Sequence, residues 1–248
     1  MLFLVLLIIV ILILQMFFRG CFIQGFILFI KDKIKDFYRY KIKKEVKPYD
    51  YYGVYLFCGR VGCGKTISMI EKAKRIKQRY PKVKIYSNFN TDISDGLITS
   101  WEQLELLENK DENGVEQGIL FLFDEIHLTF SSQGWQTAPE DLLSYVSLQR
   151  KNKKCIFCSS QVWTRVNKVI REQADFVIEC KGFFKSRIIR NKYYLQEDYA
   201  VNGEQKDSGM RKRDVMNNYC FVATDKLRSL YNTNEIIRGL KTRKDAKA

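Results

Sequence analysis

The fold of this chain is decided by the stretch Phe57-Cys58-Gly59-Arg60-Val61-Gly62-Cys63-Gly64-Lys65-Thr66. It matches the pattern G-x-x-x-x-G-K-[ST] of phosphate-binding loops. An apolar run from Val54 to Cys58 has the character of a strand and leads into it, and apolar residues at helical spacing follow it. Glycines let such a loop bend tightly and point its N–H groups at phosphate oxygens, where the helix N-terminus adds partial positive charge. The sequence therefore predicts a nucleoside triphosphate site at this loop.

Each position of the loop has an expected part in this site. Lys65 is expected to reach the β- and γ-phosphates, and the Thr66 hydroxyl is expected to ligate Mg²⁺. A chance glycine-rich turn is the alternative, but all the fixed positions of the pattern are present between a strand and a helix. The remaining residues are expected to surround the phosphates with backbone N–H groups: Gly59, Arg60, Val61, Gly62, Cys63 and Gly64.

A second part of the site is predicted at the end of the apolar run Ile119 to Phe123. Consecutive apolar residues are typical of a strand buried on both faces of a parallel sheet, and ligands bind at the carboxyl ends of such strands. Asp124 is therefore the candidate outer ligand of Mg²⁺, and Glu125 is the candidate base that polarises the attacking water. Alternatively, the acidic pair simply ends an apolar strand.

The acidic pair also bears on the class of nucleotide-binding protein. Small-molecule kinases and switch GTPases usually lack a glutamate directly after the metal-binding aspartate, whereas hydrolytic motors with an additional central strand usually have one. The guanine-binding signature Asn-Lys-x-Asp is also missing, because the nearest match, Asn152-Lys153-Lys154-Cys155, fails at its last position. ATP is therefore expected rather than GTP.

A third apolar strand is predicted from Lys154 to Ser159, with Gln161 just past its carboxyl end. In ATPases with an additional strand, this strand lies between the two nucleotide motifs and carries a polar residue that senses the γ-phosphate. Gln161 is the candidate sensor, or else it caps the following turn. Before this strand, Thr137-Ala138-Pro139-Glu140 is a capping box that predicts a helix running to Arg150.

Taken together, these motifs resemble the zonular occludens toxin and filamentous-phage assembly ATPases, within the wider FtsK and HerA group of DNA-pumping motors. The resemblance covers roughly residues 51–181, with a weak echo near residue 231. It rests on these segments: Gly59 to Thr66, Phe123-Asp124-Glu125, Gln149-Arg150 with Cys155 to Gln161, Val166 to Arg171, and Leu230-Tyr231-Asn232-Thr233.

The resemblance implies an α/β fold of the P-loop NTPase type (RecA- and FtsK/HerA-like, with an additional strand), in which helices cover both faces of a parallel sheet. It implies ATP and Mg²⁺ as cofactors and a homo-oligomeric, hexamer-like ring. An arginine of one subunit then contacts the nucleotide of the next. Arg150 and Arg171 both match family arginines, and the sequence does not choose between them; a solvated helix face is the alternative for either. DNA is the implied cargo, and phage coat or assembly proteins are implied partners.

The apolar N-terminus departs from these ATPases, which usually begin with the nucleotide domain. Leu2 to Phe18 is interrupted only by Gln15, and a helix of that length measures about 26 Å, near the roughly 30 Å hydrocarbon core of a bilayer. A second apolar run, Cys21 to Ile30, either extends this helix or lies in the interface. A cleaved signal peptide is the alternative, but neither a basic start nor a small-residue cleavage site is evident. We expect an uncleaved transmembrane anchor.

The flank from Lys31 to Lys47 is rich in lysine and arginine. By the positive-inside rule it faces the cytoplasm and leaves the N-terminus outside. We therefore expect a single-pass protein of the cytoplasmic membrane, with its ATPase domain in the cytoplasm and this flank against membrane lipid. The expected regions are an anchor (1–30), a basic linker (31–50), the ATPase domain (51–181), and a β-rich C-terminal extension with a basic tail (182–248).

The composition adds a formal net charge of +14 and 7 cysteines. Basic clusters late in the chain either contact nucleic acid phosphates or form a solvated face. Cys155 and Cys158 are spaced C-x-x-C but lack a second Cys or His pair, which argues against a zinc site, and His127 is interpreted as structural. The extension is predicted to contain these strands: Arg187 to Ile189, Tyr193 to Leu195 and Tyr219 to Val222.

The leading hypothesis is a membrane-anchored ATPase that couples hydrolysis to DNA translocation, packaging, or the assembly and extrusion of a filamentous virion. One alternative is a membrane-tethered NTPase or phosphotransferase that handles no nucleic acid. A second alternative is a morphogenesis or toxin-like scaffold in which nucleotide binding only orders assembly. All three keep the triphosphate site and differ in what it drives.

Overall fold

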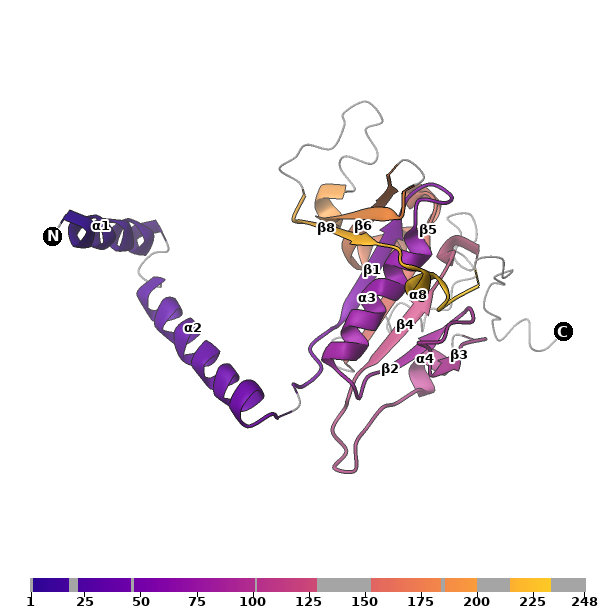
Figure 1. The fold of residues 1–248 in the computed structure, drawn as a ribbon, viewed down its shortest axis with the longest axis horizontal. Coiled ribbons are helices and arrows are strands. Elements are labelled where there is room, and N and C mark those ends of the chain that lie inside the picture. Colours follow the sequence, from indigo (N-terminus) through magenta and orange to yellow (C-terminus); the bar gives the residue numbers. More distant parts are fainter. Residues whose placement is uncertain are drawn as a thin grey trace. The chain divides into compact units, whose positions relative to one another are not determined.

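The computed structural model describes residues 2–17, 22–45, 47–100, 102–128, 153–183, 186–199 and 215–232. They belong to two compact units, Met1–Lys47 and Pro48–Ala248, whose ribbon is drawn in Figure 1. Arg150, the helix predicted from Thr137, and the late basic clusters lie outside the described residues.

The N-terminal unit consists of helices. Helix α1 spans Leu2–Phe17, α2 spans Phe22–Phe37, and the π-helix η1 spans Tyr38–Ile42. Helix α2 begins in the second apolar run and continues into the basic flank. Within the described part of the chain, no helix has both the length and the apolar character needed to cross a bilayer. The transmembrane helix expected over residues 1–30 is therefore not confirmed, since the structure divides that segment between α1 and the start of α2.

The second unit is built on one eight-stranded sheet with the order β3-β2-β4-β5-β1-β6-β7-β8. Strands β1 to β6 pair in parallel, and β7 and β8 add an antiparallel edge. Strand β5 lies between β1 and β4, so the additional central strand is confirmed. The bounds are β1 Gly53–Cys58, β2 Lys84–Ser87, β3 Gly96–Leu97, β4 Ile119–Phe123, β5 Lys154–Ser160, β6 Ala174–Gly182, β7 Ile188–Leu195 and β8 Asn217–Val222.

Each face of the sheet has its own apolar core. Neighbouring residues such as Leu56 and Phe57 point into opposite cores, which explains why the central strands are apolar along their whole length. Helices α3 and α8 contribute to one core, whereas α4, η2, η4 and α6 contribute to the other. The predicted α/β class with helices on both faces is confirmed. The bounds are α3 Lys65–Arg79, α4 Glu102–Leu106, η2 Ile126–Leu128, η4 Trp163–Arg165, α6 Lys168–Glu172 and α8 Asp225–Arg228.

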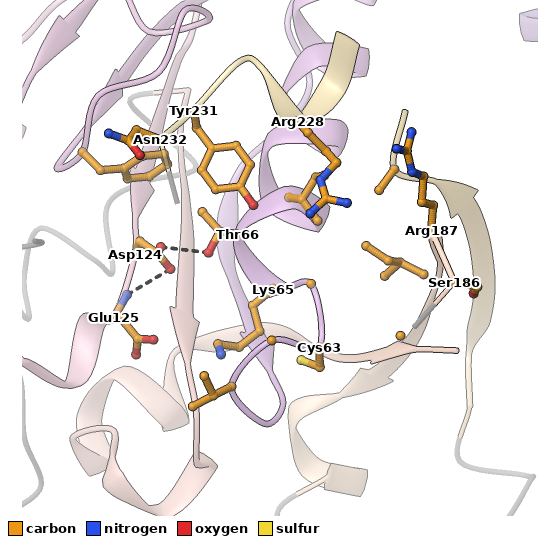
Figure 2. A pocket seen from close by; sticks show the side chains of 18 of the residues that line it. Cys63, Lys65, Thr66, Asp124, Glu125, Ser186, Arg187, Arg228, Tyr231 and Asn232 are labelled. Atoms are coloured by element: carbon orange, nitrogen blue, oxygen red, sulfur yellow. Dashed lines mark hydrogen bonds between the residues drawn. The ribbon is translucent and has the colours of Figure 1, made fainter. Parts of the chain in front are cut away.

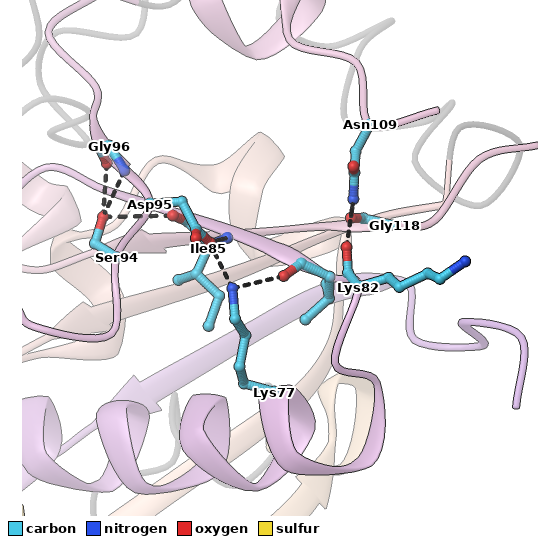
Figure 3. A network of polar contacts seen from close by, with 9 residues as sticks. Lys77, Lys82, Ile85, Ser94, Asp95, Gly96, Asn109 and Gly118 are labelled. Atoms are coloured by element: carbon cyan, nitrogen blue, oxygen red, sulfur yellow. Dashed lines mark hydrogen bonds and ion pairs between the residues drawn. The ribbon is translucent and has the colours of Figure 1, made fainter. Parts of the chain in front are cut away.

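A polar network ties helix α3 to the edge of the sheet at β2 and β3 (Figure 3). Lys77 Nζ forms a 2.7 Å ion pair with Asp95 and donates a hydrogen bond to the Val83 carbonyl oxygen at 2.8 Å. The same Asp95 oxygen accepts a hydrogen bond from the Ile85 N–H at 2.7 Å. Because these groups are partly exposed, we expect the network to fix geometry rather than to add much stability.

The strands after Gly182 continue the main sheet. Strand β7 pairs with β6, and β8 pairs with β7. The prediction of two short strands around the polar residues from Arg190 to Lys192 is wrong, because β7 is continuous there. Asn191 in its middle is buried and accepts a 3.0 Å hydrogen bond from Ser68 Oγ on α3. Tertiary packing thus overrides the local pattern.

Candidate functional site

The phosphate-binding loop joins β1 to α3 through glycines with positive φ. The φ angle is 152° at Gly59 and 96° at Gly64. A Cβ atom at Gly59 would lie 2.7 Å from the Cys180 carbonyl oxygen, and one at Gly64 would lie 2.5 Å from the Ile189 side chain. Side chains at these two positions would therefore push the loop away from β6 and β7.

Thr66 and Asp124 meet at the carboxyl edge of the sheet. Thr66 Oγ1 donates a 2.8 Å hydrogen bond to Asp124 Oδ2 (Figure 2). The other carboxylate oxygen of the buried Asp124 accepts a hydrogen bond from Ser159 Oγ near the end of β5. Asn88 holds the Asp124 backbone, since its side-chain oxygen accepts from the Asp124 N–H at 2.8 Å and its Nδ2 donates to the Asp124 carbonyl oxygen at 3.1 Å. The structure therefore brings the two predicted metal ligands together.

Sequence analysis did not single out Ser159 or Asn88. Both follow the rule that was applied to Asp124, because they lie at the carboxyl ends of the parallel strands β5 and β2. A polar residue at each strand end was the signal that would have found them.

Glu125 lies next to Gln161 in the structure. Gln161 Nε2 donates a hydrogen bond to Glu125 Oε1 at 3.3 Å. The Glu125 backbone is left-handed, with φ of 50°, and such a conformation costs a non-glycine residue about 1–3 kcal/mol. Its N–H donates to Ser159 Oγ at 3.0 Å and to Asp124 Oδ1 at 3.2 Å, and these bonds fix the turn. The candidate base and the candidate sensor are therefore held together.

The loop and the acidic pair line one cavity of about 640 Å³, a size typical of small-ligand sites. Lys65 is buried at the start of α3, and its Nζ donates to the Arg60 carbonyl oxygen at 3.4 Å. Cys63 also lines the cavity, and burial raises the pKa of its thiol although the Lys65 ammonium opposes this. A neutral thiol is therefore expected inside the loop.

The far wall of this cavity comes from the C-terminal part of the chain (Figure 2). Arg187 forms a 2.7 Å ion pair with Asp225, and a β-bridge joins Tyr231 to Thr91. Burial, together with the Asp124 carboxylate, raises the pKa of Tyr231, so its phenol stays protonated at neutral pH. No local motif marks the two arginines in the sequence. The wall is lined by Ser186, Arg187, Ile189, Ala223, Arg228, Tyr231 and Asn232.

Neither of the two predicted arginines lines this cavity in the described residues. Arg171 lies on α6, with its guanidinium carbon 5.5 Å from the centre of the Trp163 ring. Arg150 lies outside the described residues. Both were predicted to reach the nucleotide of another subunit, so their role stays a prediction.

The donor set of the cavity fits Mg²⁺. The Thr66 hydroxyl and the Asp124 carboxylate are hard oxygen donors, and they lie side by side. Among the described residues, no group of three or more His, Cys, Asp or Glu side chains is arranged to hold a metal alone. Mg²⁺ usually takes one or two protein oxygens and completes its shell with phosphate oxygens and water, which is what this pair of donors allows.

No family model matches the sequence, and no curated protein matches it significantly. Among solved structures, the N-terminal domain of zonular occludens toxin from Neisseria meningitidis is similar, with a TM-score of 0.52 over 73% of this chain and 98% of that chain at 14% identity. The genome packaging NTPase B204 from Sulfolobus turreted icosahedral virus 2 matches 51% of this chain and 73% of its own, with a TM-score of 0.40 at 13% identity. The ATPase domain of a helicase matches 86% of this chain and 99% of its own, with a TM-score of 0.47 at 10% identity. This chain has the fold of the zonular occludens toxin N-terminal domain, the family that its motifs resemble.

Proposed function

We propose that this chain is a membrane-attached, Mg²⁺-dependent ATPase that uses hydrolysis to move DNA, as in packaging or the extrusion of a filamentous virion. One observation carries the proposal. Lys65, Thr66, Asp124 and Glu125 line one cavity, and Gln161 donates a hydrogen bond to Glu125. A site that only held phosphate would not need a second carboxylate and an amide beside it.

The loop side of the cavity would hold the nucleotide. Backbone N–H groups from Gly59 to Thr66 and the Lys65 ammonium would bind the β- and γ-phosphates. Thr66 and Asp124 would hold Mg²⁺, which neutralises charge on the phosphate oxygens when it is bound. Arg187 and Arg228 in the far wall add positive charge facing the same space.

The acidic side would carry out hydrolysis. Glu125 would accept a proton from the attacking water, while its backbone bond to Ser159 keeps the carboxylate in place. Gln161 would orient one carboxylate oxygen through its 3.3 Å hydrogen bond and respond to the γ-phosphate. The sensor role is favoured over a cap because this amide donates to the candidate base.

Assembly into a hexamer-like ring belongs to the same proposal. An arginine from a neighbouring subunit, Arg150 or Arg171, would complete the charge around the transferred phosphate. The sequence resemblance supports this part.

Membrane attachment is proposed through α1. The side chains from Phe3 to Ile13 are apolar on every side of the helix, and all except Ile11 are exposed. A helix that is apolar all round needs a non-aqueous environment. The basic residues of α2 and η1 would then contact anionic lipid, with the N-terminus outside and the ATP site on the cytoplasmic side. Phage coat or assembly proteins are the proposed partners.

The test measures phosphate release by the full chain in mild detergent, with and without Mg²⁺ and DNA. We expect Mg²⁺-dependent turnover that DNA stimulates. Glu125→Gln should bind ATP but turn it over at least about 100-fold more slowly, whereas Glu172→Gln, a charge-matched control on exposed α6, should behave as wild type. Absence of Mg²⁺-dependent hydrolysis with and without DNA would overturn the proposal.

Two further measurements separate the alternatives. Mixing inactive Lys65→Ala subunits with wild type should reduce activity more than proportionally in a ring motor, but only in proportion in a monomeric NTPase. A scaffold that merely binds nucleotide should show no stimulation of turnover by DNA.

A further inference from the structure

A second cavity, of about 440 Å³, lies on the α3 face of the sheet and shares no residue with the nucleotide cavity. Its walls come from α3, the strands β1, β6, β7 and β8, and the residues just before β1 and β8. We call it the aromatic cavity. It is lined by Tyr51, Tyr55, Lys72, Arg75, Phe176, Tyr193, Met216, Asn217 and Tyr219.

Lys72 reaches into this cavity from α3 with aromatic rings around it. Its Nζ lies 4.8 Å from the ring centres of both Tyr55 and Tyr193 and 5.8 Å from that of Tyr51. None of the described carboxylates lies within ion-pair distance of it. Burial lowers the pKa of Lys72 to about 8, so a cation is held there at a cost that ring contacts alone do not remove. This arrangement leaves the ammonium without an anionic partner among the described residues.

Arg75 supplies a second cation, one turn further along α3. Its guanidinium carbon lies 4.0 Å from the centre of the Tyr219 ring, and its Nε forms a 2.8 Å ion pair with Glu71. The same Glu71 oxygen accepts a 2.9 Å hydrogen bond from the Tyr219 hydroxyl. Glu71 is thus engaged, and no acidic side chain is among the residues that line the cavity.

We propose that the aromatic cavity binds a nucleotide unit of single-stranded nucleic acid, with a base stacked on its tyrosine rings and a phosphate against Lys72 and Arg75. Proteins that bind single strands combine aromatic platforms with cations that follow the backbone. A cavity of this size accommodates a nucleotide. The missing acidic lining disfavours a cationic ligand, and the Asn217 amide offers both a donor and an acceptor to a base edge. This inference concerns a cavity apart from the ATP site and does not depend on hydrolysis.

The test is the binding of a fluorescein-labelled twenty-base oligothymidylate to the full chain in mild detergent, without ATP, followed by fluorescence anisotropy. Lys72→Met keeps the length of the side chain and removes its charge, and it should weaken binding about tenfold, as expected for one charged contact. The slope of log K against log salt should fall by about 0.7, the value for one phosphate contact on a single strand. Lys74→Met is the matched control, since this lysine lies on the same helix and does not line the cavity.

The base contact has its own pair of variants. Tyr219→Ala should weaken binding at least about fivefold because it removes a stacking ring, whereas Tyr219→Phe keeps the ring and should stay close to wild type. Excess thymidine monophosphate distinguishes the source of the ligand. Displacement of the oligonucleotide at millimolar concentration would assign the cavity to free nucleotides, and resistance would assign it to strands; both keep the recognition chemistry proposed.

Other outcomes would overturn the inference. Equal losses for Lys72→Met and Lys74→Met would mean that only general positive charge binds the strand. Loss of binding to anionic lipid vesicles in Lys72→Met, with unchanged strand binding, would assign the cavity to a membrane surface instead.

A substitution-free measurement guards against variants that fail to fold. Photocrosslinking of a bromodeoxyuridine oligonucleotide to the wild-type chain should label Tyr51, Tyr55, Tyr193 or Tyr219, and labelling confined to other regions contradicts the assignment. In Lys72→Met, ATP turnover without DNA should remain at the wild-type level. A chain that binds strands but shows no turnover would refute the proposed function and leave this inference standing.

Discussion

Thr66 at the start of α3 donates a 2.8 Å hydrogen bond to Asp124, which lies 58 residues further along the chain. The strands that lead to these residues, β1 and β4, are not neighbours in the sheet, because β5 lies between them. The bond therefore depends on the order of the strands as well as on the two motifs. Ser159 at the end of β5 completes the link by donating to the same carboxylate.

Replacing Thr66 should separate catalysis from stability. Thr66→Ala removes one hydroxyl, while Asp124 keeps its bonds to Ser159 and Asn88. We expect Mg²⁺-dependent kcat to fall at least about 100-fold while the free energy of unfolding changes by only about 1–2 kcal/mol. Thr66→Ser, which keeps the hydroxyl, should retain most of the activity. Steady-state kinetics and urea denaturation measure both effects, and equal kcat in the two variants would exclude a metal-binding role for the hydroxyl.

Ser159 and Ser160 form a matched pair of fully buried serines on β5. Ser159 Oγ bonds to Asp124 and to the Glu125 N–H, whereas Ser160 Oγ donates to the Val162 carbonyl oxygen at 3.1 Å. Ser159→Ala should therefore lower both the free energy of unfolding, by about 1–3 kcal/mol, and kcat. Ser160→Ala should lower stability alone. The expectation fails if both variants lose the same fraction of activity.

Much of the fold follows from local signals in the sequence. The glycine loop between a strand and a helix, the apolar run before Asp124, and the third run before Gln161 are each visible in short windows. Parallel strands buried on both faces have no polar side, so their unbroken apolar runs identify them. The ligand rule for strand ends then brings Thr66, Asp124, Glu125 and Gln161 to one edge.

Other parts depend on contacts between distant segments, which local patterns do not encode. The polar centre of β7 suggests a break, yet Asn191 finds Ser68, 123 residues away, as a buried partner. Arg187 and Arg228 reach the nucleotide cavity only because β7 and β8 close the sheet beside β6. The aromatic cavity is likewise assembled from five separate stretches of chain, and none of them carries a recognisable motif.

Gly64 and Gly114 test how much of the loop's requirement for glycine comes from packing. Both have positive φ, 96° and 75°, but a Cβ at Gly64 would meet Ile189 at 2.5 Å, whereas one at Gly114 would meet nothing within 4 Å. Gly114→Ala should cost about 1 kcal/mol of unfolding free energy from backbone strain alone. Gly64→Ala should cost more and also weaken ATP binding, as measured by thermal unfolding and nucleotide titration. Similar values for the two variants would show that Ile189 yields without cost.

Lys72 provides a prediction about pH. Burial is the main cause of its lowered pKa, and the nearby Arg75 lowers it further, while Glu71 and the Cys155 thiol oppose the shift. The unfolded chain therefore binds more protons than the folded chain between about pH 8 and the ordinary lysine pKa of 10.5. Stability contributed by this group should rise with pH across that interval, and the destabilisation should be complete below it.

Lys72→Met removes this titration, so it should unfold at higher denaturant than wild type at pH 7, and its advantage should shrink by about 2 kcal/mol or less between pH 8 and pH 10. The buried tyrosines Tyr51, Tyr55 and Tyr193 also have raised pKa values, but they are present in both proteins and largely cancel in the comparison. Denaturant midpoints at several pH values provide the measurement. A pH-independent difference would mean that the Lys72 ammonium is already solvated in the folded chain. A difference that shrinks as expected would mean that the chain retains a destabilising cation in the aromatic cavity, as a binding role for that cation requires.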